Sequence, residues 1–417
     1  MKKIIYCTVF LLAPVMSHGQ GYLRDDVKAS AFKKFSVSEF GFADKQPPAT
    51  YSMRQYCPPP LMQEGSTCVG WAVAYGTMST MFNNLMEVTD PTQKYFLSFD
   101  PNFLYSISVE KATSKCSQGV VMPLAIEQAM RYGFKRLLAP PAFTECNTKI
   151  TDFSTYFSEA FKPSESYTVD LSQLATAKDK IVLLKKIIAS GRPLPFGMEV
   201  TNSMVGVDGP MLTSTNPLWI PKPGEKELGG HAMTLIGYSD SKFGGAFEIM
   251  NSYGSKFGDD GFFWIKYTDF LKYVTDLYAF DPPKINSGQC KLGDCEEDYS
   301  VCVFDDGRFY EGTFTGGSFD EFGIYVWSDK TIYAGGWKND DRHGKGRFIK
   351  DGSLYAVTYI NDKMVDMEEL GFASMPDPVL SKIERELVGL GYKLKDGNDP
   401  DFVHFANDKN TRKRSDK

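Results

Sequence analysis

The sequence has few histidines, and their positions restrict the chemistry that the chain can perform. Its 417 residues include four: His18, His231, His343 and His404. Imidazole is the side chain that most often exchanges protons near neutral pH. Because His231 is the only histidine between residues 21 and 300, a histidine-dependent reaction in that part of the chain has to use it.

Long apolar runs and a strong net charge are also missing. After residue 20 no segment approaches the ~18 continuous apolar residues of a membrane span, so no transmembrane segment is predicted in the mature chain. A net charge of −6 gives no general attraction for nucleic acid or anionic lipid. The length exceeds that of one ordinary core, so two or three domains are expected.

The first twenty residues differ from the rest. Residues 1–20, MKKIIYCTVFLLAPVMSHGQ, contain two lysines, then an apolar stretch, then small and polar residues. This order predicts a secretory signal peptide that is cleaved near Gly19 or Gln20, and a secreted or periplasmic protein. A buried N-terminal strand is the alternative.

Export changes how the cysteines are interpreted. Loss of Cys7 with the signal peptide leaves seven of the eight: Cys57, Cys68, Cys116, Cys146, Cys290, Cys295 and Cys302. In an oxidising compartment an odd number leaves at least one thiol unpaired, unless chains are cross-linked.

One of these cysteines stands at the start of a predicted helix, in the stretch EGSTCVGWAVAYG at residues 64–76. Ser66 and Thr67 are suitable N-caps just before Cys68. Apolar residues then recur at helical spacing and predict a buried stripe: Trp71, Tyr75, Met78 and Phe82. The helix dipole is expected to lower the pKa of the Cys68 thiol, which suits a nucleophile. A plain core cysteine is the alternative.

A predicted hairpin supplies a base for this thiol. Two β-rich runs, residues 231–238 and 246–251, flank a turn-rich segment. With a turn centred near residues 241–243, Asn251 or a neighbour faces His231. Directly opposed side chains lie ~5 Å apart at Cβ, so the asparagine carbonyl can reach an imidazole N–H. A structural His–Asn pair is the alternative to a catalytic one.

Three segments in this order resemble the papain-like cysteine peptidases, particularly bacterial members. They are Cys68-Val-Gly-Trp71-Ala72, then Gly-His231-Ala, then Asn251-Ser-Tyr-Gly254 with Gly258-Asp-Asp-Gly261-Phe-Phe. The resemblance implies an α+β fold of two lobes, one helical and one β-rich, with the site between them. It implies Cys68 as nucleophile, His231 as general base and acid, and Asn251 as the residue that fixes the imidazole tautomer.

The resemblance also implies residues around the reacting groups. Gln63 would match the glutamine whose amide helps the Cys68 backbone N–H to bind the oxyanion. Cys116-Ser-Gln-Gly119 resembles the loop whose glycine backbone pairs with extended substrate. Trp71 and Tyr253 are also predicted to contribute to substrate binding. No cofactor or metal is implied.

The match covers about residues 48–282 and departs from the family's pattern at several points. Gln63 precedes Cys68 by five positions, one fewer than usual, and an alignment on Trp71 would put Gly70 in the nucleophile's place. Tyr253 replaces the usual tryptophan over the His–Asn bond. His231 follows Cys68 at a distance beyond the expected range of about 130–150 residues. The stretch 201–228 is the expected insertion.

The remaining cysteines are expected to form disulfides. Cys116 pairs either with Cys146 or with Cys57, and the sequence does not decide between them. Residues 283–303 form a Cys-rich linker containing Cys290, Cys295 and Cys302. A metal site there would lack an evident fourth ligand, so a disulfide is favoured.

Residues 304–366 contain an internal repeat. Tyr310, Tyr333 and Tyr355 are each followed four residues later by an aromatic residue. The middle unit, YAGGWKNDDRHGKGRF, resembles a MORN repeat, and it includes His343, which is interpreted as structural. Each unit predicts a β-hairpin that shares a core with its neighbours. Contacts with proteins or the cell envelope are a possible role, and a stabilising platform is the alternative.

These features predict an exported peptidase of five parts after the signal peptide. They are a short N-terminal extension (21–47), a papain-like domain (48–282), the linker (283–303), a small all-β repeat domain (304–366), and a C-terminal helix with a basic tail (367–417). The expected substrate is a peptide or protein. A degenerate binding protein and a hydrolase of cell-wall amides remain as alternatives, the second because PDPVLSKIERELVGLGYKL faintly resembles a peptidoglycan-binding helix.

Overall fold

The computed structural model describes most of the chain after residue 20. The described ranges are 21–35, 46–109, 116–139, 144–146, 148–150, 155–204, 212–351 and 353–372. The predicted signal peptide and the predicted C-terminal helix and tail lie outside them, as does part of the N-terminal extension. Within the described ranges, no helix combines the length and apolar character needed to cross a membrane.

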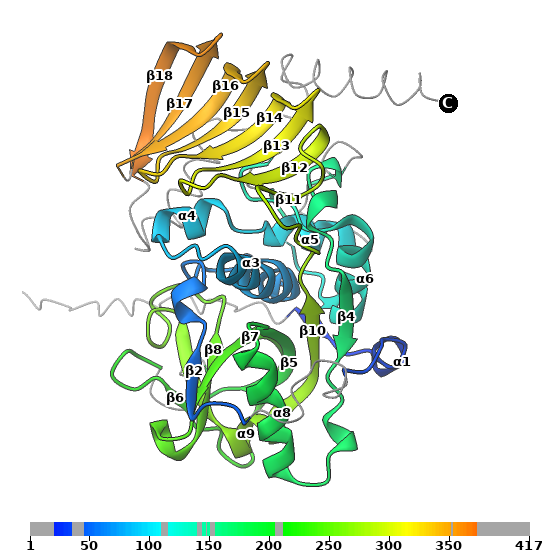
Figure 1. Cartoon of the computed structure of the whole chain (residues 1–417). Helices are drawn as coiled ribbons and strands as arrows, with labels where there is room; N and C mark the ends of the chain where they lie inside the picture. Colours follow the sequence, from blue (N-terminus) through cyan, green and yellow to red (C-terminus); the bar gives the residue numbers. More distant parts are fainter. Residues whose placement is uncertain are drawn as a thin grey trace, which may run out of the picture.

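A helical region lies between two eight-stranded sheets (Figure 1). The first sheet has the order β4-β10-β5-β7-β8-β9-β6, with β2 paired to β7. The second runs from β11 to β18 with each strand beside the next in sequence. The expected mixture of a helical part and a β-rich part in an α+β fold is therefore present.

The helical region is built around one buried helix in three consecutive segments: α2 (Cys68–Gly70), the π-helical segment η2 (Trp71–Met78) and α3 (Ser79–Leu85). The helices α4 (Pro91–Phe96), α5 (Pro101–Ser108) and α6 (Met122–Tyr132) surround it. Asp90 and Asp100 cap α4 and α5, and each is followed by a proline whose missing N–H costs nothing at that position.

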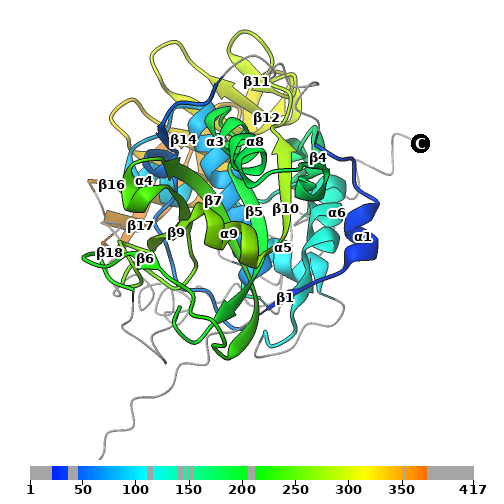
Figure 2. The same cartoon turned by 90° about the horizontal axis from the view of Figure 1, so that it is seen from below.

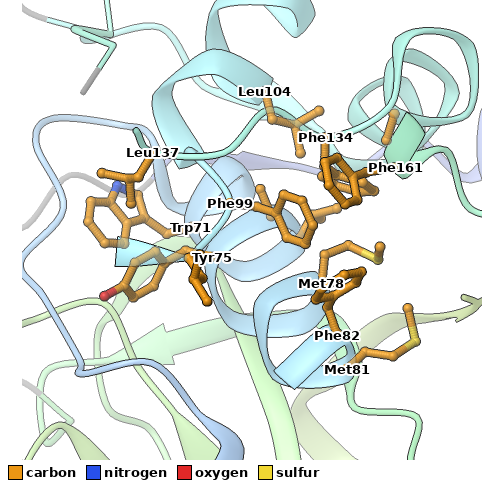
Figure 3. Packing of buried hydrophobic residues seen from close by; sticks show 14 of the residues in the cluster. Trp71, Tyr75, Met78, Met81, Phe82, Phe99, Leu104, Phe134, Leu137 and Phe161 are labelled. Carbon is orange, nitrogen blue, oxygen red and sulfur yellow. The ribbon is translucent and has the colours of Figure 1, made fainter. Parts of the chain in front are cut away.

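The apolar stripe expected on this helix is confirmed. Trp71, Tyr75, Met78 and Phe82 are all buried, and they pack with Phe99, Leu104 and Phe161 (Figure 3). The expected side-chain cap is wrong. Thr67 occupies the N-cap position, but its hydroxyl donates to the Glu64 carbonyl rather than accepting from the helix.

The first sheet is a continuous buried layer. Its strands are β2 (Thr50–Ser52), β4 (Glu165–Thr168), β5 (Leu194–Thr201), β6 (Leu218–Trp219), β7 (Glu227–Ser239), β8 (Ala246–Met250), β9 (Phe262–Lys266) and β10 (Val274–Asp281). Helices α8 (Ala177–Ala189) and α9 (Tyr267–Tyr273) pack against it and share its core. The predicted hairpin of residues 231–251 is confirmed as β7 and β8, which pair antiparallel with Thr234 opposite Met250.

The second sheet is a regular antiparallel meander. Its strands are β11 (Cys290–Leu292), β12 (Glu297–Val303), β13 (Phe309–Thr315), β14 (Ser318–Val326), β15 (Ile332–Lys338), β16 (Asp341–Lys350), β17 (Ser353–Ile360) and β18 (Lys363–Phe372). In its first two repeats a tyrosine ring lies flat over a pair of facing glycines. A Cβ built on Gly323 would lie 2.4 Å from Tyr310, and one on Gly346 would lie 2.5 Å from Tyr333. Only glycine leaves room for these rings.

In the part of the chain that the structure describes, the cysteines form two disulfides, Cys116–Cys146 and Cys290–Cys295. The first decides between the two pairings that the sequence left open. The second bears out the disulfide expected in the linker. Cys57, Cys68 and Cys302 remain as free thiols.

The second sheet shares a core with the helical region. Phe322 and Ile324 belong to the same buried cluster as the central helix, and the rings of Phe157 and Phe322 lie 5.4 Å apart. A fully buried ion pair joins the two parts, with 3.0 Å between Arg136 Nη2 and Glu311 Oε2. The Tyr299 hydroxyl donates to the same carboxylate at 2.8 Å.

This ion pair is expected to be essential to the joint. Glu311→Ala leaves the Arg136 guanidinium buried without its carboxylate, so it should lower the free energy of unfolding by about 3–5 kcal/mol. The matched control is Asp306→Ala, which breaks an exposed pair with Arg308 and should lower the free energy of unfolding far less, because solvent screens that pair. Urea unfolding of both variants measures the difference, and equal losses would show that the buried pair does not stabilise the joint.

Candidate active site

Cys68 begins the central helix and is completely buried. Burial raises the pKa of its thiol to about 11, although backbone groups of Ala232 and Gly21 act in the opposite direction. The lowered pKa expected from the helix dipole is therefore not found in this arrangement. The physical reason is loss of water around the sulfur, which outweighs the dipole.

His231 and Asn251 are brought together beside this thiol. Their Nε2 and Oδ1 atoms lie 2.8 Å apart, and both side chains are buried. With the proton on Nε2, the imidazole donates to the asparagine carbonyl, which also accepts the Ser252 backbone N–H at 2.8 Å. The residue after His231 is Ala232, whose backbone contacts the Cys68 thiol. Asn251 thus fixes the imidazole ring of His231, and the backbone of the next residue, Ala232, contacts the Cys68 sulfur.

Tyr253 covers the His–Asn pair. Its ring stacks on the His231 ring with centroids 4.7 Å apart and an angle of 20° between planes. Because Tyr253 is itself buried, it shields the imidazole rather than forming an open substrate surface. Trp71, also predicted to contact substrate, lies in the core against Tyr75. The prediction for Trp71 is corrected for that reason: a side chain used for internal packing is not presented to a ligand.

Gln63 joins the two halves of the site. Its backbone N–H donates to the Ser252 carbonyl at 2.8 Å, and the Ser252 hydroxyl donates to its side-chain oxygen at 2.6 Å. Its side-chain amide donates to the Gly65 carbonyl at 2.8 Å, within the loop before Cys68. Although Gln63 precedes Cys68 by one position fewer than in the family, it still lies between the loop before Cys68 and Ser252, the residue after Asn251.

The chain's own N-terminal segment occupies the site. Strand β1 (Tyr22–Leu23) pairs in parallel with β3 (Val120–Val121), and the Val120 N–H donates to the Gly21 carbonyl at 2.7 Å. A Cβ on Gly119 would lie 2.7 Å from that carbonyl. In Figure 2 the blue segment runs along the boundary between the cyan helices and the green sheet. It takes the position beside Gly119 where an extended substrate was expected.

Tyr22 anchors this segment in a pocket that sequence reasoning missed. Its ring lies against Gly197 and Gly230, where a Cβ would come within 2.4 Å and 2.6 Å of it. Its hydroxyl donates to Asp276 Oδ1 at 2.8 Å. Asp276 also accepts from Tyr278 and from the Gly197 N–H, while burial raises the pKa of its carboxyl. No local pattern could have indicated this contact, because it joins residues 254 positions apart.

No family model matches the chain. Among curated relatives, an uncharacterised peptidase C1-like protein of Acanthamoeba polyphaga mimivirus is 35% identical over 137 residues, covering 30% of this chain and 42% of the relative. A cathepsin B-like cysteine proteinase of Caenorhabditis elegans is 29% identical over 126 residues, covering 30% of this chain and 29% of the relative. The chain thus spans less than half of the length of either relative.

Solved structures also match part of this chain. Xylellain, a cysteine protease from Xylella fastidiosa, has a TM-score of 0.49 and 21% identity, and the match covers 64% of this chain and 96% of that one. A procathepsin B of Trypanosoma congolense has a TM-score of 0.47 and 14% identity, with 64% and 87% covered. By sequence, part of this chain is similar to one protein named as peptidase C1-like and to another named as a cathepsin B-like cysteine proteinase.

Displacing the N-terminal segment should activate the thiol. Tyr22→Gly removes the ring and the bond to Asp276, so water should reach Cys68 and its pKa should fall. Each unit of fall gives tenfold more thiolate near pH 7, so iodoacetamide should label Cys68 at least about tenfold faster. Val27→Ala, in the same segment but with an 81% exposed side chain, is the control. Mass mapping of the labelled cysteine decides, and equal rates in Tyr22→Gly and Val27→Ala would refute a covering role.

Proposed function

We propose that this chain is an exported cysteine peptidase that hydrolyses peptide bonds through a Cys-His-Asn mechanism. The observation that carries the proposal is the pairing of His231 with Asn251 at 2.8 Å on the strand that contacts the Cys68 thiol. A nucleophile, a base and a group that orients the base then come from three separated parts of the sequence. The homology to proteins named as cysteine peptidases supports the same reaction class.

The reaction follows from the roles of these groups. The Cys68 thiolate attacks the carbonyl carbon of the scissile bond and forms an acyl-enzyme. Asn251 holds the Nε2 side of His231, so Nδ1 is the nitrogen that takes the thiol proton and passes it to the leaving amine. Gln63 and the Cys68 backbone N–H are the proposed donors to the negative oxygen of the intermediate. Water then releases the acid, with His231 as its base.

The substrate is proposed to be an extended peptide or protein segment. The chain's own residues Gly21 to Leu23 already lie extended beside Val120, which demonstrates that a backbone fits there. They run parallel to β3 and fill the site, so a substrate gains access to Cys68 only after they leave. Activity therefore depends on a competition between this segment and the substrate.

Two features support export and the repeat assignment. Disulfides form and persist in oxidising compartments, and two are present here, in keeping with the signal-like residues 1–20 and a secreted or periplasmic location. The stacked hairpins with tyrosines over glycine pairs support MORN-like repeats as a platform beside the helical region.

A binding protein without catalysis is the second candidate. The pKa of about 11 for the Cys68 thiol, together with its complete burial, favours it for the covered state. The cell-wall hydrolase alternative depended on the C-terminal helix, which lies outside the described residues. Digestion of a denatured protein and of purified cell wall, side by side, separates these functions. A cell-wall hydrolase would release muropeptides from the cell wall, a peptidase would cleave the denatured protein, and a binding protein would do neither.

Substitutions in the site test the mechanism. Cys68→Ala and His231→Ala should both lower kcat by at least about 100-fold, because the nucleophile or its proton carrier is lost. Asn251→Ala should reduce kcat by less, since the base remains but is not held. A matched control is His343→Ala, which removes a histidine whose Nδ1 lies 3.1 Å from the Asn361 side chain on the second sheet. Hydrolysis of a fluorescently labelled denatured protein is the measurement. Full activity of the Cys68 variant would end the peptidase proposal.

A further inference from the structure

A third cysteine lies beside the disulfide at the edge of the second sheet. Cys290 and Cys295 form the bond, and Cys302 is a free thiol. On the β11–β12 ladder, Cys290 is the direct partner of Cys302. Opposed residues on an antiparallel ladder point to the same face, so the free thiol and the disulfide share one side of the sheet.

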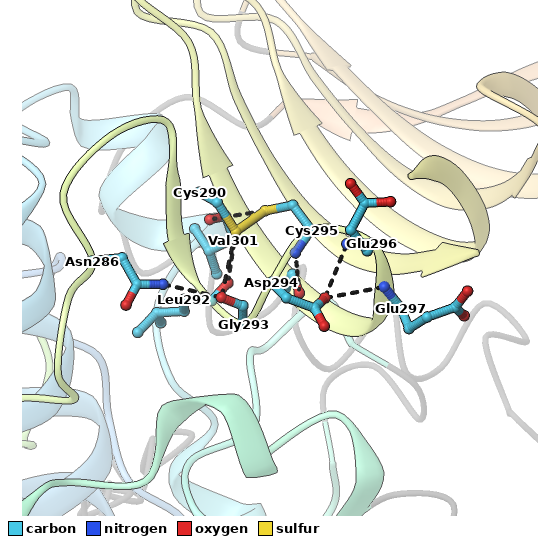
Figure 4. The surroundings of a disulfide bond; sticks show 10 residues. Asn286, Cys290, Leu292, Gly293, Asp294, Cys295, Glu296, Glu297 and Val301 are labelled. Atoms are coloured by element: carbon cyan, nitrogen blue, oxygen red, sulfur yellow. Dashed lines mark hydrogen bonds between the residues drawn. A yellow bond between two sulfur atoms is a disulfide. The ribbon is translucent and has the colours of Figure 1, made fainter. Parts of the chain in front are cut away.

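The positions of Cys295 and Cys302 agree with the pairing of Cys290 and Cys302 on the β11–β12 ladder. Cys295 Sγ lies 3.8 Å from the carbonyl oxygen of Val301, the residue before Cys302 (Figure 4). Cys302 is buried in the aromatic cluster with Tyr310, and Cys295 packs against the same cluster. The Cβ atoms of opposed residues lie about 4.5–5.5 Å apart, which is close to the span of a disulfide, about 3.5–4.5 Å. The register therefore makes Cys302 a second candidate partner for Cys290.

We propose that Cys290, Cys295 and Cys302 form a thiol–disulfide exchange site, in which Cys302 replaces Cys295 as the partner of Cys290. The Cys302 thiolate attacks Cys290 Sγ, a Cys290–Cys302 bond forms, and the Cys290–Cys295 bond breaks. The electron pair leaves on Cys295 Sγ, which takes up a proton. One disulfide and one thiol are present before and after the step, so it needs no oxidant or reductant.

The turn that carries Cys295 is held without the disulfide. The Asp294 carboxylate accepts the backbone N–H groups of Glu296 and Glu297 at 2.9 and 3.0 Å (Figure 4). The Cys295 N–H donates to the Ser300 hydroxyl at 3.2 Å. The turn can thus persist after exchange, with its released thiol half-buried between exposed neighbours. This makes Cys295 a modification site for small molecules that carry a disulfide. The Cys295 thiolate would attack that disulfide, form a mixed disulfide with one half of the small molecule and release the other half as a thiol.

The exchange also changes which segments of the chain the disulfide links. The Cys290–Cys295 bond closes a short turn, whereas a Cys290–Cys302 bond would link strand β11 covalently to strand β12. Leu292 and Val301 of these strands are part of the core shared with the helical region. The site therefore sits where the chain leaves the first sheet and joins the second.

Peptide mapping tests the proposal on the full mature chain. A Cys68→Ser background removes the proposed nucleophile, so that its thiol takes no part in the experiment. The protein is held at about pH 8.5 with iodoacetamide present, because exchange needs a thiolate and burial raises the pKa of the Cys302 thiol, and it is then quenched with acid. Trypsin cuts after Lys291 and a glutamate-specific protease cuts after Glu296, so the three cysteines fall on three peptides. We expect a Cys290–Cys302 linked pair in about one tenth of the molecules or more, with label on Cys295.

Two variants identify the attacking thiol. Cys302→Ser and Cys302→Ala should each abolish the Cys295 label and leave only the Cys290–Cys295 pair. Cys57→Ser removes a buried free thiol that belongs to neither disulfide, so it should leave the exchange unchanged. The proposal is overturned when Cys290 is joined to Cys295 alone and label is confined to Cys302. It is also overturned when Cys295 is labelled equally with and without Cys302.

Discussion

The contact between the central helix and strand β7 is the constraint on which the rest of the site depends. The Thr234 hydroxyl donates to the Ala72 carbonyl at 2.9 Å, in the π-helical part of the helix. Gly76 keeps the helix and strand close, because a Cβ there would lie 2.2 Å from the Thr234 hydroxyl. Cys68 lies at the start of that helix and His231 three residues before Thr234. The backbone positions of Cys68 and His231 are thus set by the packing of this helix against strand β7.

The state of the thiol depends on a second set of contacts that cross the same boundary. Tyr22 and Gly21 come from the N-terminal segment, Gly119 from the loop before β3, and Asp276 from the last strand of the first sheet. Burial of the sulfur raises the pKa of the Cys68 thiol, although the Gly21 backbone acts in the opposite direction. The proposed catalytic groups and the N-terminal segment that covers them are therefore parts of one arrangement, in which we propose that reactivity is gained when the segment leaves.

Local patterns predicted the groups of the site better than their surroundings. The His231–Asn251 contact could be predicted because a hairpin brings nearby residues together, and Cys68 because a helix start is a local signal. Two features escaped prediction for physical reasons. The Thr67 hydroxyl donates to the Glu64 carbonyl instead of accepting from the helix, and the Tyr22–Asp276 bond joins distant residues without any periodic signal. The shared core of the helices and second sheet likewise arises from long-range packing, of which Arg136 and Glu311 are an example.

A structure of the protein after reaction with a peptidyl epoxide tests the central claim most directly. The account predicts a covalent bond to Cys68 Sγ, the peptide extended beside Val120, and residues 21–23 displaced from that position. His231 should still be held by Asn251 and face the modified sulfur. A reagent that leaves Cys68 unmodified, or one bonded to it while Tyr22 remains on Asp276, would contradict the account.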